Sequence, residues 1–212
     1  MNLIGKKPAP ETRKIKAVIF DMGGVLLRTM DPQPRIGLAR EFSTTREELE
    51  KVVFHSESSK ASEVGQLSDE EHWASVFKHF GVKFEDYLDA YDRFFAGDRI
   101  DQRLIDFIRS ISKKVKTGML SNAWVNARRL LSERYDFMDV FDVSIFSYEI
   151  GERKPSREIF EIMLERLDVS AEESIFVDDF QENVAGAKEL GIHAIHFQSA
   201  EQIIASVEQW LD

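Results

Sequence analysis

Near its start the chain runs from Ala17-Val18-Ile19-Phe20 directly into Asp21-Met22-Gly23-Gly24-Val25. A short apolar run with β-branched residues, followed by glycines, is typical of a buried strand. The carboxylate of Asp21 then stands where that strand ends, on a loop whose two glycines let a ligand approach the backbone closely. This stretch predicts a strand that delivers an acidic group to a ligand-accessible loop.

Similar short apolar runs recur along the chain, and helical patterns separate most of them. The expected strands cover 16–20, 115–120, 141–146, 174–178 and 192–197. The expected helices, with apolar residues three and four positions apart, cover 101–112, 124–135, 156–167 and 181–190. Strands that alternate with helices indicate βαβ units, so we predict an α/β fold with a Rossmann-like parallel sheet as its core.

The interval from 29 to 100 interrupts this alternation. It holds only helical patterns, at 47–54, 69–80 and 84–95, and two prolines mark its entry. We therefore predict an α-helical cap inserted after the first strand. The predicted domains are a Rossmann-like catalytic core of residues 1–28 and 101–212, with 1–14 as a flexible arm, and a helical cap of residues 29–100.

Composition narrows the class of protein. Of the 212 residues 43% are hydrophobic, and no apolar run approaches the roughly 18 residues that span a bilayer. The net charge of −10 argues against a nucleic-acid surface, and zero cysteines exclude disulfides, thiolate metal sites and cysteine nucleophiles. The polar, basic first residues lack the apolar segment of a signal peptide. We therefore expect a cytoplasmic protein that binds neither nucleic acid nor membranes.

Polar residues stand at the ends of several predicted strands. Asp21 follows the first, Ser121 follows the second, Asp178 and Asp179 close the fourth, and Lys154 lies in the loop after the third. The carboxyl ends of parallel strands meet at one edge, where ligands bind in doubly wound folds. Carboxylates gathered there would repel one another unless they surround a cation, and an all-oxygen donor set favours Mg²⁺.

These residue types suit the transfer of a phosphoryl group. Ser121 would offer a hydroxyl at a helix start, Lys154 a positive charge, and the glycine loop its backbone groups. Phosphoryl transfer requires such groups around the equatorial oxygens of the phosphate. We therefore predict a Mg²⁺-dependent phosphomonoester hydrolase for a small phosphorylated metabolite, with Asp21 as the nucleophile that forms an aspartyl-phosphate.

Four ordered motifs resemble those of the haloacid dehalogenase superfamily, in its subgroup with a helical cap after the first strand. They are Phe20-Asp21-Met22-Gly23-Gly24-Val25, Leu120-Ser121-Asn122, Lys154-Pro155, and Val177-Asp178-Asp179 with Asn183. The resemblance implies that Asp21 and Lys154 are catalytic. It implies a metal held by Asp21, the Gly23 carbonyl and Asp179, with Asp178 acting indirectly. The substrate-binding residues that it implies are Met22, Gly23, Ser121, Asn122 and Lys154.

One position departs from this pattern. Phosphatases of the superfamily usually carry a second aspartate two residues after the nucleophile, as general acid and base, and this chain has Gly23 there. Because such catalysis is typically worth about 10²–10⁴-fold, its absence favours substrates with good leaving groups. A glycine here resembles bacterial glucose-1-phosphate phosphatases, so a sugar 1-phosphate is our leading expectation. The cap residues that offer an alternative proton donor are His55, Glu57, Glu63 and Asp69.

Other functions stay open at this point. A non-catalytic phosphate-binding or regulatory protein would keep the site without turnover, and a dehalogenase would use the same nucleophile without a metal. A phosphomutase must activate a sugar hydroxyl, which the missing acid–base group at position 23 disfavours. Receiver domains carry their acid pair after the first strand, whereas here Asp178 and Asp179 follow the fourth, which excludes that class.

Overall fold

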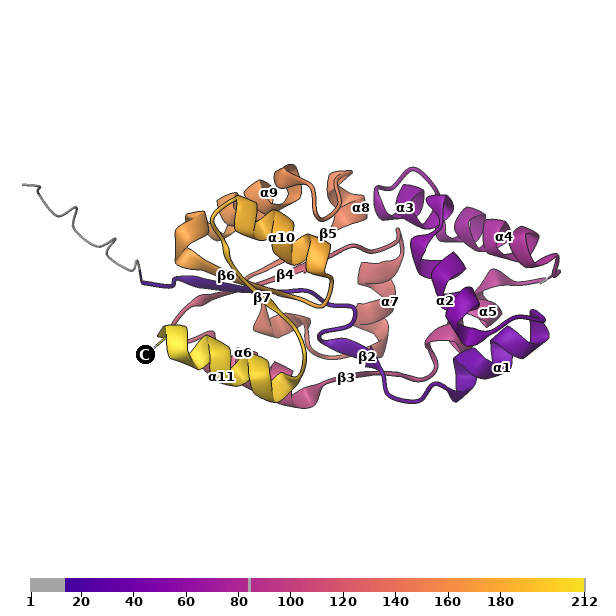
Figure 1. The fold of residues 1–212 in the computed structure, drawn as a ribbon, viewed down its shortest axis with the longest axis horizontal. Coiled ribbons are helices and arrows are strands. Elements are labelled where there is room, and N and C mark those ends of the chain that lie inside the picture. Colours follow the sequence, from indigo (N-terminus) through magenta and orange to yellow (C-terminus); the bar gives the residue numbers. More distant parts are fainter. Residues whose placement is uncertain (1–13, 84, 212) are drawn as a thin grey trace, which may run out of the picture.

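A five-stranded parallel sheet forms the centre of the core (Figure 1). The computed structural model describes residues 14–83 and 85–211. Neighbouring strands follow the order β5–β4–β1–β6–β7, and every neighbouring pair is parallel. The strands of this sheet are β1 (Ala17–Phe20), β4 (Lys116–Ser121), β5 (Val143–Phe146), β6 (Ser174–Asp178) and β7 (His193–His196).

β1 occupies the middle of the sheet because it is paired on both sides. Ala17 pairs with Lys116 of β4 and with Ser174 of β6, and all four residues of β1 are buried. A strand covered on both faces is a continuous apolar run, which is the pattern of 17–20. The parallel alignment brings the carboxyl ends of β1, β4 and β6 to one edge.

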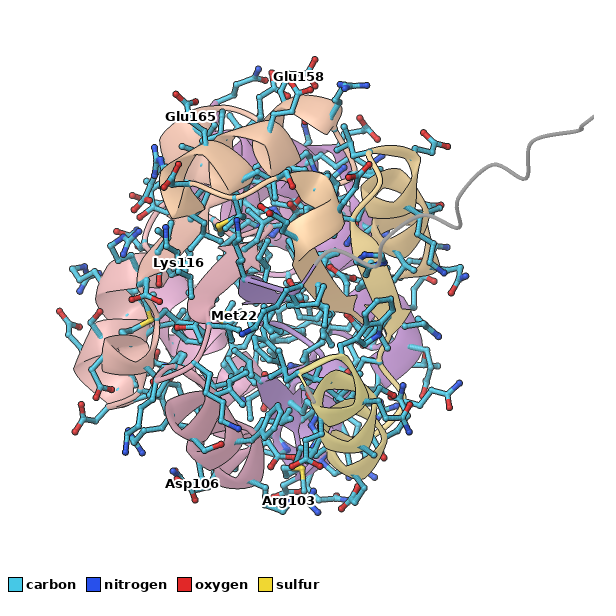
Figure 2. All side chains as sticks on the ribbon, turned by 90° about the vertical axis from the view of Figure 1, so that its left-hand side faces the viewer. Met22, Arg103, Asp106, Lys116, Glu158 and Glu165 are labelled. Carbon is cyan, nitrogen blue, oxygen red and sulfur yellow. The ribbon has the colours of Figure 1, made fainter. Side chains whose placement is uncertain are left out.

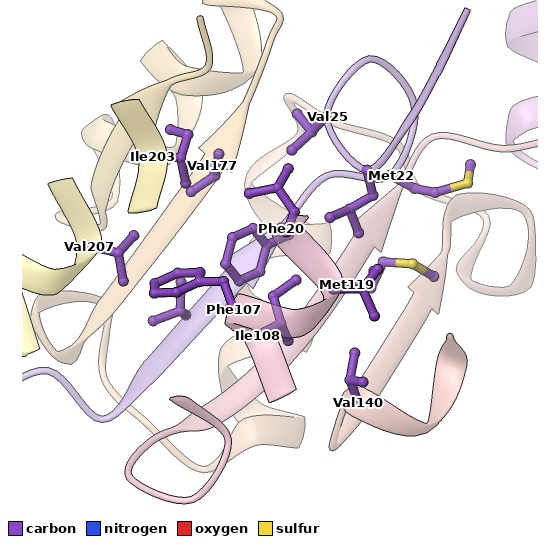
Figure 3. Packing of buried hydrophobic residues seen from close by; sticks show 14 of the residues in the cluster. Phe20, Met22, Val25, Phe107, Ile108, Met119, Val140, Val177, Ile203 and Val207 are labelled. Carbon is purple, nitrogen blue, oxygen red and sulfur yellow. The ribbon is translucent and has the colours of Figure 1, made fainter. Parts of the chain in front are cut away.

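Helices cover both faces of this sheet, and side-chain alternation along β1 decides which residue meets which layer. Val18 and Phe20 belong to the apolar cluster formed with α6 (Gln102–Ile111) and α11 (Ala200–Leu211), part of which Figure 3 shows. Ala17 and Ile19 belong to the cluster on the other face. The remaining helices of the core are α7 (Ala127–Arg134), α8 (Ser147–Ile150), α9 (Arg157–Leu167) and α10 (Gln181–Glu189), with 3₁₀ turns η1 (Met138–Val140) and η2 (Ala171–Glu173).

The cap lies at one end of the molecule and has an apolar core of its own (Figure 1). Trp73 and Phe94 are fully buried in its aromatic cluster. Trp124 and Leu130, which follow β4 in the chain, belong to the same cluster, so the cap interior continues into α7. The cap helices are α1 (Gln33–Glu41), α2 (Arg46–His55), α3 (Glu57–Glu63), α4 (Asp69–Phe80) and α5 (Tyr87–Phe95).

A short antiparallel pair joins the two ends of the cap segment. In it β2 (Leu27–Thr29) pairs with β3 (Asp98–Ile100), and Leu27 lies opposite Ile100. These strands were not predicted from the sequence, because each has three residues of mixed polarity and its partner lies far along the chain. The predicted cap limits at 29 and 100 coincide with the last residues of the two strands.

The predicted α/β class with a Rossmann-like sheet is confirmed, and the differences concern individual elements. The C-terminal helix α11 was not predicted, and α7 begins at Ala127 because Trp124 turns into the cap cluster. The predicted arm, apart from Lys14, and residue 84 of a predicted cap helix lie outside the described residues. Within 14–83 and 85–211, no helix has the length and apolar character needed to cross a membrane.

Candidate active site

The carboxyl ends of three neighbouring strands bring the predicted polar residues together. Asp21 directly follows β1, Ser121 ends β4, and Asp178 ends β6. Because β1 lies between β4 and β6, groups from both neighbours flank the Asp21 carboxylate. Lys154 reaches the same place from the loop between α8 and α9, and it is buried with 1% of its surface exposed.

Lys154 joins two carboxylates in the protein interior. Its Nζ donates a hydrogen bond to Asp21 Oδ1 and another, 2.7 Å long, to Asp178 Oδ2. Its Nζ also lies 5.4 Å from the centre of the Phe176 ring. Burial opposes the positive charge, but the attraction of Asp21 and Asp178 outweighs it, so the pKa of Lys154 is raised. The lysine therefore stays charged beside the candidate nucleophile.

Asp178 is hydrogen-bonded through both of its oxygens. The Phe180 N–H donates to Oδ1 over 2.7 Å, and the Asn183 side-chain amide lies 3.0 Å from Oδ1 and 3.1 Å from Oδ2. With Lys154 also bound, these partners occupy the carboxylate. Asp178 is thus suited to orienting Lys154 and to an indirect role toward a cation.

Asp179 differs from Asp178 because its Oδ1 is buried and has no hydrogen-bond partner among the described residues. Burial raises the pKa of Asp179 to about 6, and the charge of Asp178 adds to the shift. The ring Nε2 of His196 lies 2.9 Å from the Asp179 carbonyl oxygen, a contact that no sequence motif indicated. A buried carboxylate oxygen without a donor is a position for a cation.

Gly24 lies against the Asp179 carboxylate. A Cβ at Gly24 would stand 2.1 Å from Asp179 Oδ2, and the residue has a φ of +82°. Both the close approach and the left-handed backbone require glycine. At Gly23, by contrast, nothing lies within 4 Å of the Cβ position. Of the two glycines in the loop, Gly24 is therefore the one that this geometry requires.

The three aspartates together form an acidic group suited to a metal ion. One carboxylate oxygen from each of Asp21, Asp178 and Asp179 lies within 4.8 Å of the others. Burial raises the pKa of Asp21 well above its usual range, Lys154 opposes the shift, and the two neighbouring carboxylates add to it. Three acids and one lysine leave negative charge uncompensated, and the oxygen-only donors fit a hard divalent cation such as Mg²⁺.

The Asn122 side chain holds the Lys154 loop. Its Oδ1 accepts from the Lys154 N–H over 2.8 Å, and its Nδ2 donates to the Lys154 carbonyl over 3.0 Å. The predicted contact between Asn122 and a phosphate would therefore fall to its backbone. Ser121 is 1% exposed, and among the described residues its Oγ makes only a long contact, 3.4 Å, to the Asn122 carbonyl.

Met22 packs into the core. Its side chain belongs to the cluster of Phe20 and Met119, and it lies in the interior of Figure 2, whereas Asp106 and Glu165 lie at the outer surface. Any contact of Met22 with a substrate would be made by its backbone.

The four cap residues considered as proton donors lie in different surroundings. Glu63 is 8% exposed and accepts from Arg153, and the His55 ring lies 5.9 Å from that of Phe180, next to Asp179. Glu57 pairs with Lys60 at the surface and its side chain is 90% exposed, so its position does not suit a proton donor at the acidic group. Asp69 is buried at the start of α4, and hydrogen bonds from Asn126 partly offset the rise in its pKa that burial causes. Of the four, His55 and Glu63 contact residues that neighbour the acid pair and Lys154 in the chain.

The fold and this buried acid–lysine site define the class of protein. The family model of haloacid dehalogenase-like hydrolases matches residues 15–191. The chain therefore belongs to that family and is a hydrolase.

The chain is similar to curated phosphatases and to solved structures of this family. It is 29% identical over 182 residues to a sesquiterpene phosphatase of Aspergillus oryzae, which covers 85% of this chain and 89% of the relative. It is 29% identical over 190 residues to a D-ribitol-5-phosphate phosphatase of Bacteroides thetaiotaomicron. This match covers 84% of this chain and 89% of the relative. A haloacid dehalogenase family enzyme of Bacteroides thetaiotaomicron, solved with magnesium and inorganic phosphate, shares the fold with a TM-score of 0.73 and 22% identity, covering 88% and 96%.

Proposed function

We propose that this protein is a Mg²⁺-dependent phosphomonoester hydrolase that acts on a small phosphorylated metabolite. The observation that carries the proposal is the buried set in which Lys154 joins Asp21 to Asp178 while Asp179 keeps an oxygen without a partner. Such a set supplies a nucleophile, a fixed positive charge and a cation position, which phosphoryl transfer requires. The similarity to two phosphatases supports the same class of reaction.

In this mechanism Asp21 is the nucleophile. Its carboxylate oxygen forms a bond to phosphorus as the bond between phosphorus and the leaving oxygen breaks, and the electron pair departs on the leaving oxygen, which takes a proton from water. Water then attacks the phosphorus of the aspartyl-phosphate and the bond between phosphorus and the Asp21 oxygen breaks. This step releases inorganic phosphate, passes a proton of the water to solvent and restores the Asp21 carboxylate. Lys154 orients Asp21 and offsets charge on the phosphoryl oxygens, because its ammonium is already hydrogen-bonded to the nucleophile.

The other site residues hold these groups in place. Asp21, Asp179 and the Gly23 carbonyl would hold Mg²⁺, which when bound offsets the charge of the phosphate and of the carboxylates. Asp178 acts through Lys154, since its oxygens are occupied by hydrogen bonds. The phosphate would contact the Ser121 hydroxyl, Lys154, and the backbone of Met22, Gly23 and Asn122.

We expect substrates with good leaving groups, with sugar 1-phosphates as the leading class. Gly23 offers no side chain to protonate a departing alkoxide, so an alcohol with a lower pKa should leave faster. The open space around Gly23 means that this absence is not imposed by packing.

The first experiment measures phosphate release from sugar 1-phosphates, sugar 6-phosphates and aryl phosphates, with Mg²⁺ or EDTA. We expect Mg²⁺-dependent release that Asp21→Asn lowers by about 10⁴-fold or more. Asp106→Asn, at an exposed position on α6, is the matched control and should behave as wild type. Absence of release together with Mg²⁺ and phosphate binding would support the non-catalytic alternative, and metal-independent chloride release from 2-haloacids would support a dehalogenase.

The leaving-group argument has its own test in Gly23→Asp. If the missing acid limits the rate, the substitution raises turnover of sugar 6-phosphates by about 10²-fold and changes aryl phosphate turnover little. Gly23→Asn, which adds a similar volume without an acid, is the control. Equal effects of both variants on both substrates would contradict the argument.

A further inference from the structure

We propose that Glu63 of the cap is a positioning residue for Lys154, because it ties helix α3 to the loop that carries the lysine. The inference rests on the proposed function, since it gives Glu63 a part in the same reaction. Under this proposal, the same contact holds the cap on the core and positions the catalytic lysine.

Glu63 makes a polar contact between the cap and the Lys154 loop. Its Oε2 accepts a hydrogen bond of 2.5 Å from Nε of Arg153, the residue before Lys154. The side chains of Glu63 and Arg153 are 10% and 35% exposed. Burial raises the pKa of Glu63, and the Arg153 guanidinium opposes that shift. The carboxylate is thus bound directly to the residue that precedes the lysine.

The same face of α3 also holds the loop after β4. Ser59 lies four residues before Glu63, so both side chains are on one face of the helix. Its Oγ accepts from the Trp124 indole N–H over 3.1 Å, and the Trp124 ring stacks on Phe54 with 6.0 Å between ring centres. α3 thus contacts both loops of the candidate phosphate site.

The two loops are joined to each other, which closes a ring of contacts around the site. The three links of this ring are Ser59 to Trp124, Asn122 to the Lys154 backbone, and Arg153 to Glu63. Any motion of α3 away from the core must break one of the two links that α3 makes.

The turn after α3 also sits tightly on the core. Gly65 has a φ of +74°, and a Cβ there would lie 2.9 Å from the Tyr148 carbonyl oxygen of α8, which precedes the Lys154 loop. The close contact between Gly65 and Tyr148 keeps the end of α3 near the Lys154 loop, where Glu63 faces Arg153. Because Trp124 is 7% exposed within the apolar cap cluster and Arg153 is 35% exposed, the Glu63–Arg153 link is the one that opens first.

The test compares Glu63→Gln with Glu57→Gln in the full chain. Glu57 lies on the same helix, but it pairs with Lys60 at the surface and its side chain is 90% exposed, so it is a matched control. For the best substrate of the panel, we expect Glu63→Gln to lower kcat and kcat/KM together by about tenfold, as a small misplacement of a catalytic group does. Glu57→Gln should match wild type.

A double-mutant cycle with Arg153→Gln tests whether the pair acts as one unit. The double variant should lose no more activity than the more damaging single variant, because either substitution already breaks the link. Losses that multiply would overturn the pairing. A rise in KM with unchanged kcat would also overturn it, since that result assigns Glu63 to substrate binding alone.

Amide hydrogen exchange gives a readout that does not need turnover. The Lys154 N–H is bonded to Asn122, so Glu63→Gln should speed exchange in residues 151–156 by about tenfold, whereas Glu57→Gln should not. If wild type hydrolyses no phosphate ester and exchange still quickens, the proposed function fails and the role of Glu63 stands. If wild type is active and Glu63→Gln matches it in both turnover and exchange, the inference is wrong and the function stands.

Discussion

Arg35 in the cap and Lys154 in the core are both buried basic residues. They differ in how completely the polar and charged groups around them are paired. The Arg35 guanidinium donates to Asp98 over 3.0 and 2.8 Å, to Glu50 over 2.9 Å and to the Phe94 carbonyl over 3.1 Å. It also lies 4.4 Å from the centre of the Phe94 ring. This buried charge is enclosed by partners, as expected where its role is to hold the cap to β3.

Lys154 stands among carboxylates that it does not fully neutralise. It bonds Asp21 and Asp178, while Asp179 keeps a buried oxygen without a partner. The pKa of Asp179 is raised to about 6 by burial and then by Asp178, and burial raises that of Asp21 as well. A buried charge with a structural role is thus paired within the chain. A candidate site for a metal and a phosphate instead keeps an unpaired carboxylate oxygen and excess negative charge, which ligands would neutralise.

The largest expected effect concerns Lys154→Met. Removing the ammonium should lower phosphate release by about 10³-fold, or about 4 kcal/mol of transition-state stabilisation, because Asp21 and the phosphoryl oxygens lose their fixed charge. Steady-state rates with saturating Mg²⁺ measure this effect. Arg35→Met is the control, and its kcat per folded molecule should stay within about threefold of wild type. Similar activity losses in both variants would contradict the assignment of a catalytic role to Lys154 and a structural role to Arg35.

Arg35→Met should in turn have the larger effect on stability in the presence of Mg²⁺. It leaves Asp98 and Glu50 without their buried partner, which should cost about 3 kcal/mol or more of unfolding free energy. Urea denaturation with and without Mg²⁺ measures this cost. The metal should not recover the loss in Arg35→Met, because among the described residues Asp98 and Glu50 belong to no acidic group suited to a metal ion, whereas it should recover part of any loss in Lys154→Met.

A smaller effect on stability and Mg²⁺ binding distinguishes the two glycines of the loop that follows Asp21. Gly24→Ala should cost about 1–2 kcal/mol in backbone strain, since Gly24 has a φ of +82°, and should weaken Mg²⁺ binding because its Cβ meets Asp179 Oδ2. Gly23→Ala should change neither quantity, because nothing lies within 4 Å of its Cβ position. Thermal unfolding and Mg²⁺ titration calorimetry on both variants would show the contrast, and equal behaviour would contradict it.

The smallest expected effect is a pH dependence of the stabilisation by Mg²⁺. The pKa of Asp179 is raised in the folded protein to about 6, so without metal the folded state binds more protons than the unfolded state between pH about 4 and about 6. In the absence of metal, the contribution of Asp179 to the free energy of unfolding therefore falls as the pH rises from about 4 to about 6. Mg²⁺ competes with the proton, so the difference in Tm between Mg²⁺ and EDTA should be larger at pH 7.5 than at pH 5.

Asp179→Asn is the control for that experiment. It removes this titrating group, so the Mg²⁺ effect on Tm should become smaller, and its difference between pH 5 and pH 7.5 should shrink. An unchanged pH profile in this variant would assign the dependence to another carboxylate.

Local sequence patterns predicted the parts of the site that lie at strand ends. Asp21, Ser121 and Asp178 each follow an apolar run, and the geometry of a parallel sheet places such residues at one edge. Among the elements that were not predicted, the strands β2 and β3 are those whose stability comes from distant partners. β2 and β3 have three residues each and depend on each other across the whole cap segment.

The amino-acid sequence by itself determined the α/β class, and it predicted the interrupting helical segment and the candidate site residues, because these depend on periodicity and side-chain type. Only the tertiary structure decided that Asn122 binds the Lys154 backbone, that Trp124 enters the cap cluster, and that Glu63 meets Arg153. The physical reason is that contacts between side chains far apart in the chain follow from how the layers pack, and no local pattern specifies that packing.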